Sequence, residues 1–102
     1  MVDDIKNHGI LDVKGEAGIK NLDNKGKATL GGNSKVLLIV NDGDLGLKGS
    51  SSVAKIQNNA NVHLSGNSIT GDITNSGSVR ATEKPSIINY TTINNGVLVD
   101  ES

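Results

Sequence analysis

The hydrophobic and polar positions of the chain repeat at an interval of about 17 residues, and a fixed period of this kind indicates a repeated structural unit. An Ile or Leu is followed two positions later by Asn, and two positions after that by Gly or Ala. The aliphatic column is Ile5, Leu22, Ile39, Ile56 and Ile73, the asparagine column is Asn7, Asn24, Asn41, Asn58 and Asn75, and the third is Gly9, Gly26, Gly43, Ala60 and Gly77. A sixth copy, with Asn94 and Gly96, is displaced by two residues, which we assign to a longer connection through Thr91 and Thr92. Six units of this length account for the 102 residues of the chain.

The stretch after each Gly has the period-2 pattern of a strand with one solvent-facing side. The second and fourth positions are apolar: Leu11 and Val13, Ala28 and Leu30, Leu45 and Leu47, Val62 and Leu64, and Val79 and Ala81. The residues between them are Asp12, Thr29, Gly46, His63 and Arg80. We therefore expect a short strand in each unit, with its apolar side turned inward.

A second inward pair follows in each unit, and the aliphatic column comes three positions after it. These pairs are Ala17 and Ile19, Ser34 and Val36, Ser51 and Val53, Ser68 and Thr70, and Pro85 and Ile87, with Tyr90 joining the aliphatic column in the fifth unit. Between the two strands lie Gly15, Gly32, Gly49 and Gly66. Glycine at this corner indicates a backbone with positive φ.

These patterns predict an all-β fold, a single-chain parallel β-helix (β-solenoid) of six coils. The repeated unit is too short for the common helical repeats, and its alternation is that of strands. The coils are expected at about 3–18, 19–35, 36–52, 53–69, 70–86 and 87–102 of a single domain, 1–102. Equivalent strands would stack about 4.8 Å apart, and right-handed winding is the usual expectation for parallel strands.

The asparagine column predicts a ladder of side-chain amides along one corner of the solenoid. Each amide has a donor and an acceptor and can bond to the amide of the next coil, and Asn also tolerates left-handed dihedral angles at bends. The predicted ladder consists of Asn7, Asn24, Asn41, Asn58, Asn75 and Asn94. Its role is expected to be structural.

The composition agrees with a narrow interior and excludes several kinds of site and partner. The chain has 13 Gly, one Pro and no Phe, Trp or Cys, so disulfides and thiolate metal sites are excluded. A net charge of −1 with both signs interspersed gives no reason to expect nucleic acid as a partner. The longest apolar run, residues 36–40, is too short to span a membrane, and the first residues lack a secretory signal pattern. We expect a cytoplasmic location if the chain is complete, and a cell-surface location if it is an excised fragment.

No arrangement of residues indicates an enzyme, a cofactor or a metal site. His8 and His63 fall in different columns and different coils, so they are expected to be solvated side chains. Asp42 and Asp44 flank Gly43 without the later acidic ligand of a calcium loop, and they are interpreted as turn residues. The pattern has neither the outward threonine column of an ice-binding solenoid nor the exposed aromatic side chains on which β-helices usually bind carbohydrate. The glycosylation sequon at Asn89, Tyr90 and Thr91 is interpreted as accidental.

The surface offers a candidate lateral contact and two candidate end contacts. Leu37, Leu38, Ala54 and Ile88 form the candidate lateral contact, because the apolar run has more side chains than one thin coil can turn inward. No amphipathic cap precedes the first coil, and the last coils depart from the pattern at Glu83, Pro85 and Asp100. If both ends are open, stacking of coils between copies is expected.

The repeat and the phrase SITGDITNSGSV in the fifth unit resemble the bactofilin core, a bacterial cytoskeletal β-helix. This resemblance implies end-to-end homopolymers without nucleotide, often at a membrane. The phrases ITNSGSV, LDNKGKATL and INNGVLVDES are equally similar to the repeats of autotransporter passengers and other surface β-helices. Two functions therefore stay open: a structural subunit of filaments or fibres, and a spacer or binding segment of a bacterial surface adhesin or phage fibre.

Overall fold

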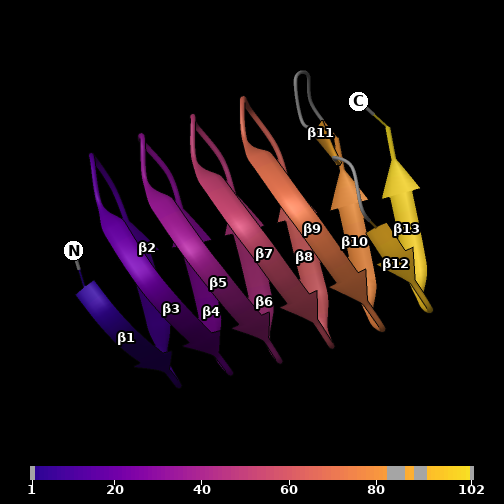
Figure 1. Cartoon of the computed structure of the whole chain (residues 1–102), viewed down its shortest axis with the longest axis horizontal. Helices are drawn as coiled ribbons and strands as arrows, with labels where there is room; N and C mark the ends of the chain where they lie inside the picture. Colours follow the sequence, from indigo (N-terminus) through magenta and orange to yellow (C-terminus); the bar gives the residue numbers. More distant parts are fainter. Residues whose placement is uncertain (1, 83–86, 89–91, 102) are drawn as a thin grey trace.

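The chain forms a β-solenoid with two sheets of parallel strands, and successive strands alternate between these sheets up to the last coil (Figure 1). The structure is a computed structural model, and it describes residues 2–82, 87–88 and 92–101. All regular elements among these residues are strands, and the described part of the chain contains no helix. The predicted fold class is confirmed.

The two sheets differ in the length of their strands. The long-strand sheet contains β1 (Val2–Asn7), β3 (Gly18–Asn24), β5 (Lys35–Asn41), β7 (Ser52–Asn58), β9 (Ile69–Asn75), β11 (Ile87–Ile88) and β12 (Thr92–Asn94). The short-strand sheet contains β2 (Ile10–Val13), β4 (Lys27–Leu30), β6 (Asp44–Leu47), β8 (Asn61–Leu64), β10 (Ser78–Ala81) and β13 (Val97–Asp100). Both β11 and β12 pair with β9, so the described residues form six layers in each sheet, and about five turns separate the first layer from the last.

The strands pair in the register that the sequence repeat predicts. Leu22 pairs with Ile39 and Asn24 with Asn41, while Ala28 pairs with Leu45 in the other sheet. Because parallel strands in register bring identical positions side by side, each repeated residue type forms a continuous column through the stack. The columns assigned from the sequence are therefore columns in space over the first five layers.

Each long strand contains a bend where the alternation of inward and outward side chains changes phase. Ile19 and Leu22 both face the interior although they are three residues apart, and Lys20 is left out of the paired register. Two consecutive residues, such as Leu37 and Leu38, therefore point outward at this bend. A local break in pairing of this kind bends a strand, as an inserted residue does.

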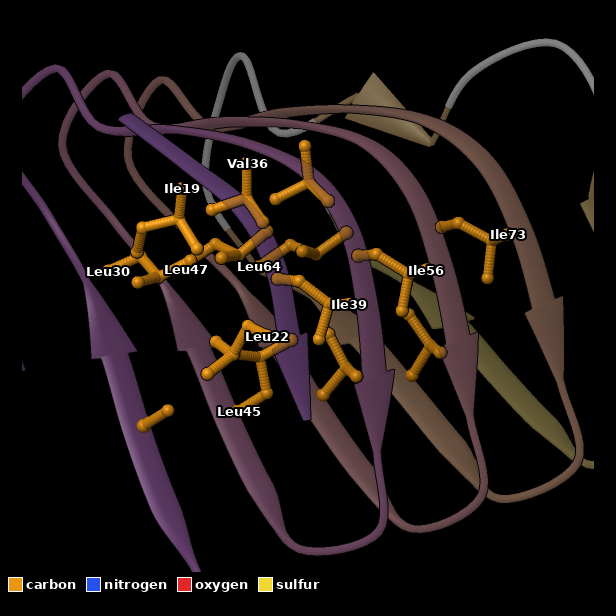
Figure 2. Packing of buried hydrophobic residues seen from close by; sticks show 14 of the residues in the cluster. Ile19, Leu22, Leu30, Val36, Ile39, Leu45, Leu47, Ile56, Leu64 and Ile73 are labelled. Carbon is orange, nitrogen blue, oxygen red and sulfur yellow. The ribbon is translucent and has the colours of Figure 1, made fainter. Parts of the chain in front are cut away.

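The interior is filled by stacked aliphatic columns (Figure 2). Ile39 and Leu47 are fully buried, and equivalent residues above and below them continue each column. Burying one such side chain contributes roughly 1.5–3 kcal/mol. The inward positions are occupied by Ile, Leu, Val, Ala, Ser, Thr and Asn, and this small cross-section explains the scarcity of aromatic residues.

The corner between the two sheets requires glycine for two separate reasons. Gly32 has a φ of +60°, a conformation that other residues adopt only at a cost. A Cβ atom at Gly32 would also overlap the backbone of Gly15 in the preceding coil. The predicted positive φ is thus confirmed, and close stacking of the coils adds a second restriction.

The last coil departs from the predicted register in one respect. Ile87 pairs with Ile69 and Ile88 with Thr70, so one residue of the displacement precedes β11, and the second lies between Ile88 and Thr92. Assigning the whole displacement to Thr91 and Thr92 was therefore wrong, and so was pairing Ile87 with Thr70. The predictions for Glu83, Pro85 and Tyr90, and the sequon at residues 89–91, lie outside the described residues.

We predict that Ile39→Ala destabilises the protein by about 2–5 kcal/mol, because it leaves a cavity in the middle of an aliphatic column. Leu37→Ala is the matched control, since Leu37 lies in the same strand and is 51% exposed, and its cost should stay below about 1 kcal/mol. Unfolding by denaturant measures both changes. Equal costs would contradict the assignment of the core.

Candidate functional site

An asparagine ladder runs the length of the solenoid at the end of the long strands. The Nδ2 atom of each Asn donates to the Oδ1 atom of the Asn one coil later, at 2.8 or 2.9 Å. The series is Asn7, Asn24, Asn41, Asn58, Asn75 and Asn94, as the sequence predicts. Asn24, Asn41, Asn58 and Asn75 are buried, so the ladder is a polar column inside the core.

Backbone groups of the same corner complete the bonding of each amide. Nδ2 of Asn41 also donates to the carbonyl of Asn61 in the next coil and to the carbonyl of Gly43. Oδ1 of Asn41 accepts from the backbone N–H of Gly43 and from Nδ2 of Asn24. Buried polar groups with all their bonds made cost little, whereas unsatisfied ones cost about 1–3 kcal/mol each. The ladder therefore stabilises the corner and fixes the registration of neighbouring coils.

The first end face of the solenoid consists of β1 and β2. Each is the edge strand of its sheet, and no other described element pairs with its outer side. Ile5, Leu11 and Val13 are only partly buried there, although their columns are fully buried one coil later. A Cβ atom at Gly9 would meet nothing, while one at Gly26 would overlap the carbonyl of Gly9. This face is thus an incomplete layer with an unpaired backbone edge.

The second end face consists of β12 and β13, with β11 beside them in the long-strand sheet. Leu98 continues an aliphatic column and packs against the core, and Thr92 occupies the position of Ile73. Asp100 pairs in register with Ala81, so it has a carboxylate at a position where the preceding coils have an aliphatic side chain. This confirms the position that the sequence assigns to Asp100. Asn94 ends the ladder and is exposed.

Large exposed apolar side chains concentrate in the two terminal coils. Ile10 is 83% exposed and Val97 is 56% exposed, and both belong to an outward column that is polar at Lys27, Asp44, Asn61 and Ser78 in between. Val2, Ile93 and Val99 are exposed in the same two coils. The sequence analysis missed this feature, although comparing this column from coil to coil would have revealed it. Exposed apolar groups next to an unpaired edge are typical of a contact surface.

The candidate lateral contact lies at the bend of the long strands, and only some of its predicted residues share the expected column. Leu37 and Ala54 are exposed in neighbouring layers, and Leu38 is half-buried beside a small hollow that Lys55 and Ile93 also line. Ile88 is in register with Thr70 and not with Gly71, so its expected place in the column of Leu37 and Ala54 is wrong. The observed patch is smaller than predicted.

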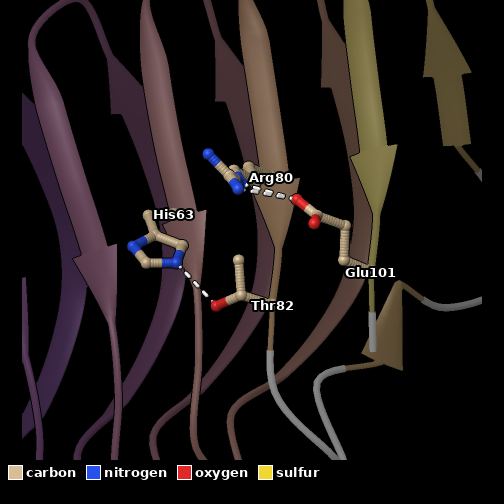
Figure 3. A network of polar contacts seen from close by, with 4 residues as sticks. All are labelled: His63, Arg80, Thr82 and Glu101. Atoms are coloured by element: carbon tan, nitrogen blue, oxygen red, sulfur yellow. Dashed lines mark hydrogen bonds and ion pairs between the residues drawn. The ribbon is translucent and has the colours of Figure 1, made fainter.

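The outer face of the short-strand sheet carries a network of polar contacts near the end of the chain (Figure 3). Arg80 forms an ion pair of 2.8 Å with Glu101, and Nε2 of His63 lies 2.8 Å from Oγ1 of Thr82. These contacts join the last three layers, and an exposed ion pair contributes about 0–1 kcal/mol. His8 lies in another column, on the first coil, so the structure does not bring the two histidines together.

The carboxylates around Gly43 are bonded to asparagines of the next coil. Oδ1 of Asp42 accepts from Nδ2 of Asn59 at 2.8 Å, and Oδ1 of Asp44 accepts from Nδ2 of Asn61 at 3.1 Å. The part of the chain that the structure describes holds no group of three or more His, Cys, Asp or Glu side chains arranged to hold a metal ion. No helix among the described residues is suited to crossing a membrane.

A scan against protein-family models found no match, and searches of curated proteins and of solved structures also found none. The resemblance to bactofilins thus stays a prediction. The β-solenoid and its asparagine ladder are shown by the strand pairing and by the hydrogen bonds between the side-chain amides.

We predict that Asn58→Ala destabilises the protein by more than about 2 kcal/mol, because it removes the bonds of a buried amide on both sides. Asn59→Ala is the control: the side chain of this next residue is exposed, and the cost should stay below about 1 kcal/mol. Denaturant unfolding compares the two variants. Similar losses would show that the ladder adds nothing beyond an ordinary surface amide.

Proposed function

We propose that this protein is a structural β-solenoid that associates with copies of itself through its end faces to form filaments. The observation that carries the proposal is the state of these faces. Among the described residues, the edge strands of each face have no partner on their outer side, and exposed apolar side chains lie next to them. The first face also has the partly buried Ile5, Leu11 and Val13, and the second face has Leu98. A second copy is the partner whose layers have the matching spacing in both sheets at once.

The repeated geometry supports the same conclusion. Within the chain, each layer of the ladder is covered by another that follows it by 17 or, at the last step, 19 residues. Covering the first layer in this way would bury Ile5, Leu11 and Val13 as completely as Leu22, Ala28 and Leu30 are buried. Burial of apolar surface is favourable by about 25 cal/mol per Å², and the exposed backbone groups would gain hydrogen bonds at the same time.

The alternative function is a spacer or binding segment of a surface adhesin or phage fibre. In that case the ends would be continued or covered by other structure, and the 102-residue chain would stay monomeric at high concentration. Recognition would then lie on an outward face, such as the patch of Leu37, Leu38 and Ala54. The end faces favour the filament, since neither of them is polar throughout, as the outer face of a terminal repeat usually is.

We predict that the purified chain forms fibres with a repeat near 4.8 Å along the axis, and that Gly9→Val abolishes them. A side chain at Gly9 is free of contacts within the chain, but it projects from the first end face toward any covering layer. Electron microscopy and fibre diffraction measure the assembly. Circular dichroism checks that the variant is folded.

The matched control is Gly46→Val, because a Cβ atom at Gly46 also meets only an ordinary contact but lies on the outer face of a middle coil. This variant should form fibres at the same concentration as the parent chain. Fibres of unchanged length from Gly9→Val, or a monodisperse monomer from the parent chain, would refute association through the first end face.

We also predict that Asp100→Asn lowers the concentration needed for assembly by about tenfold, equivalent to about 1.4 kcal/mol. Asp100 has an inward-facing register position on an end face, so a covering copy must remove its carboxylate from water. Asp72→Asn changes the net charge equally on the exposed side of a middle strand and should leave this concentration unchanged. Light scattering against concentration compares them, and equal shifts would assign the effect to net charge.

A further inference from the structure

We infer that the copies join head to tail, with the second end face of one copy covering the first end face of the next, so that the filament is polar. The inference rests on the proposed end-to-end association and adds its orientation. The asparagine ladder determines the orientation, because in every bond between two of its members the Nδ2 atom donates toward the second end face and the Oδ1 atom accepts from the side of the first end face.

Backbone groups fix this direction. In the ladder residues, Oδ1 accepts from the N–H two residues later, and Nδ2 donates to carbonyls, so turning an amide over would face donor to donor and acceptor to acceptor. The first end face therefore presents an acceptor, Oδ1 of Asn7. Among the described residues no Asn side chain donates to this atom, whereas Oδ1 of every later Asn in the ladder accepts from the Asn one coil earlier. The second end face presents a donor, Nδ2 of Asn94, which has only the carbonyl of Gly96 at 3.3 Å among the contacts the structure gives.

A head-to-tail joint satisfies both groups with the bonds that recur inside the chain. Nδ2 of Asn94 would donate to Oδ1 of Asn7 of the next copy, as Nδ2 of Asn75 donates to Asn94. It would also reach the carbonyl of Ile10 of the next copy, because Nδ2 of Asn7 reaches the carbonyl of Lys27 in the same relative position. The polar column thus continues across the joint without an unsatisfied member.

The neighbouring columns match in the same orientation. Val97 would lie beside Ile10 of the next copy, which pairs the two exposed apolar residues of an otherwise polar outward column. Leu98 would cover Leu11, and Glu101 would lie beside Lys14, which has the opposite charge. Asp100 is a mismatch in this orientation, because it would face Val13.

A two-fold joint between identical faces lacks this match. It would pair β1 with itself in antiparallel orientation, and full overlap of its six residues would place Asn7 opposite Val2. The polar column would then end against apolar positions on both sides of the joint. A joint between two second end faces would place Asn94 opposite Thr92, so the ladder would end without an amide partner, and it would pair Val97 with Asp100.

Engineered cysteines distinguish the two orientations, because the natural chain contains none. His8 and Asn95 belong to one outward column at opposite ends and are both exposed. Head-to-tail stacking would place Asn95 one strand spacing, about 4.8 Å, from His8 of the next copy, which suits a disulfide. We would oxidise H8C alone, N95C alone, their equimolar mixture and the double variant, and separate the products on non-reducing gels.

The expected result is a disulfide-linked dimer in the mixture, at least tenfold above either single variant, and a ladder of longer products from the double variant. Adding Gly9→Val to the first-face variant should remove the dimer. If fibres form but the mixture gives no more dimer than H8C alone or N95C alone, the orientation inferred here is overturned while end-to-end association stands. If no variant gives products above a dilute-solution background and no fibres form, both proposals are overturned.

Discussion

The structure depends on one constraint: every coil must lie on the next at the spacing of hydrogen-bonded parallel strands, in two sheets at the same time. This spacing allows no independent adjustment of a single residue, because a shift at one position displaces the whole layer. Equivalent positions must therefore carry side chains that pack against copies of themselves. The columns that contain Ile39 and Leu47 meet this condition with aliphatic groups, and the column of Asn41 meets it with an amide that is its own partner.

The same constraint explains which polar groups the narrow core accepts. A buried amide would be costly alone, but in a column each donor faces an acceptor, and the remaining bonds go to backbone groups at the corner. Glycine at the two corners allows the backbones of adjacent coils to approach, and Gly32 adds a positive φ. Ala60 occupies one of these corner positions, where the bond from Asn61 to the carbonyl of Gly43 is 3.1 Å long.

A stack of this kind is complete everywhere except at its two ends. The forces that hold coils together inside the chain are available again wherever a layer is left uncovered, so the end faces and the ladder termini form one system. Their chemistry is not symmetric: one face offers an acceptor and apolar residues, and the other offers a donor, apolar residues and the carboxylate of Asp100. The proposed association uses this asymmetry, because it brings the donor of one face to the acceptor of the other.

The period, the inward columns, the corner glycines and the asparagine ladder could all be predicted from the sequence, because in a repeated fold each contact between coils corresponds to a fixed interval along the chain. The features that break the repeat could not be predicted in this way and are visible only in the folded chain. The register of Ile88 depends on how two extra residues are divided between connections, and the exposure of Ile10 and Val97 depends on which layers lack a neighbour. The direction in which the ladder amides donate follows from backbone groups that the asparagine pattern does not specify. An Asn side chain can donate or accept on either side, and the neighbouring backbone N–H and carbonyl groups determine which way it is turned.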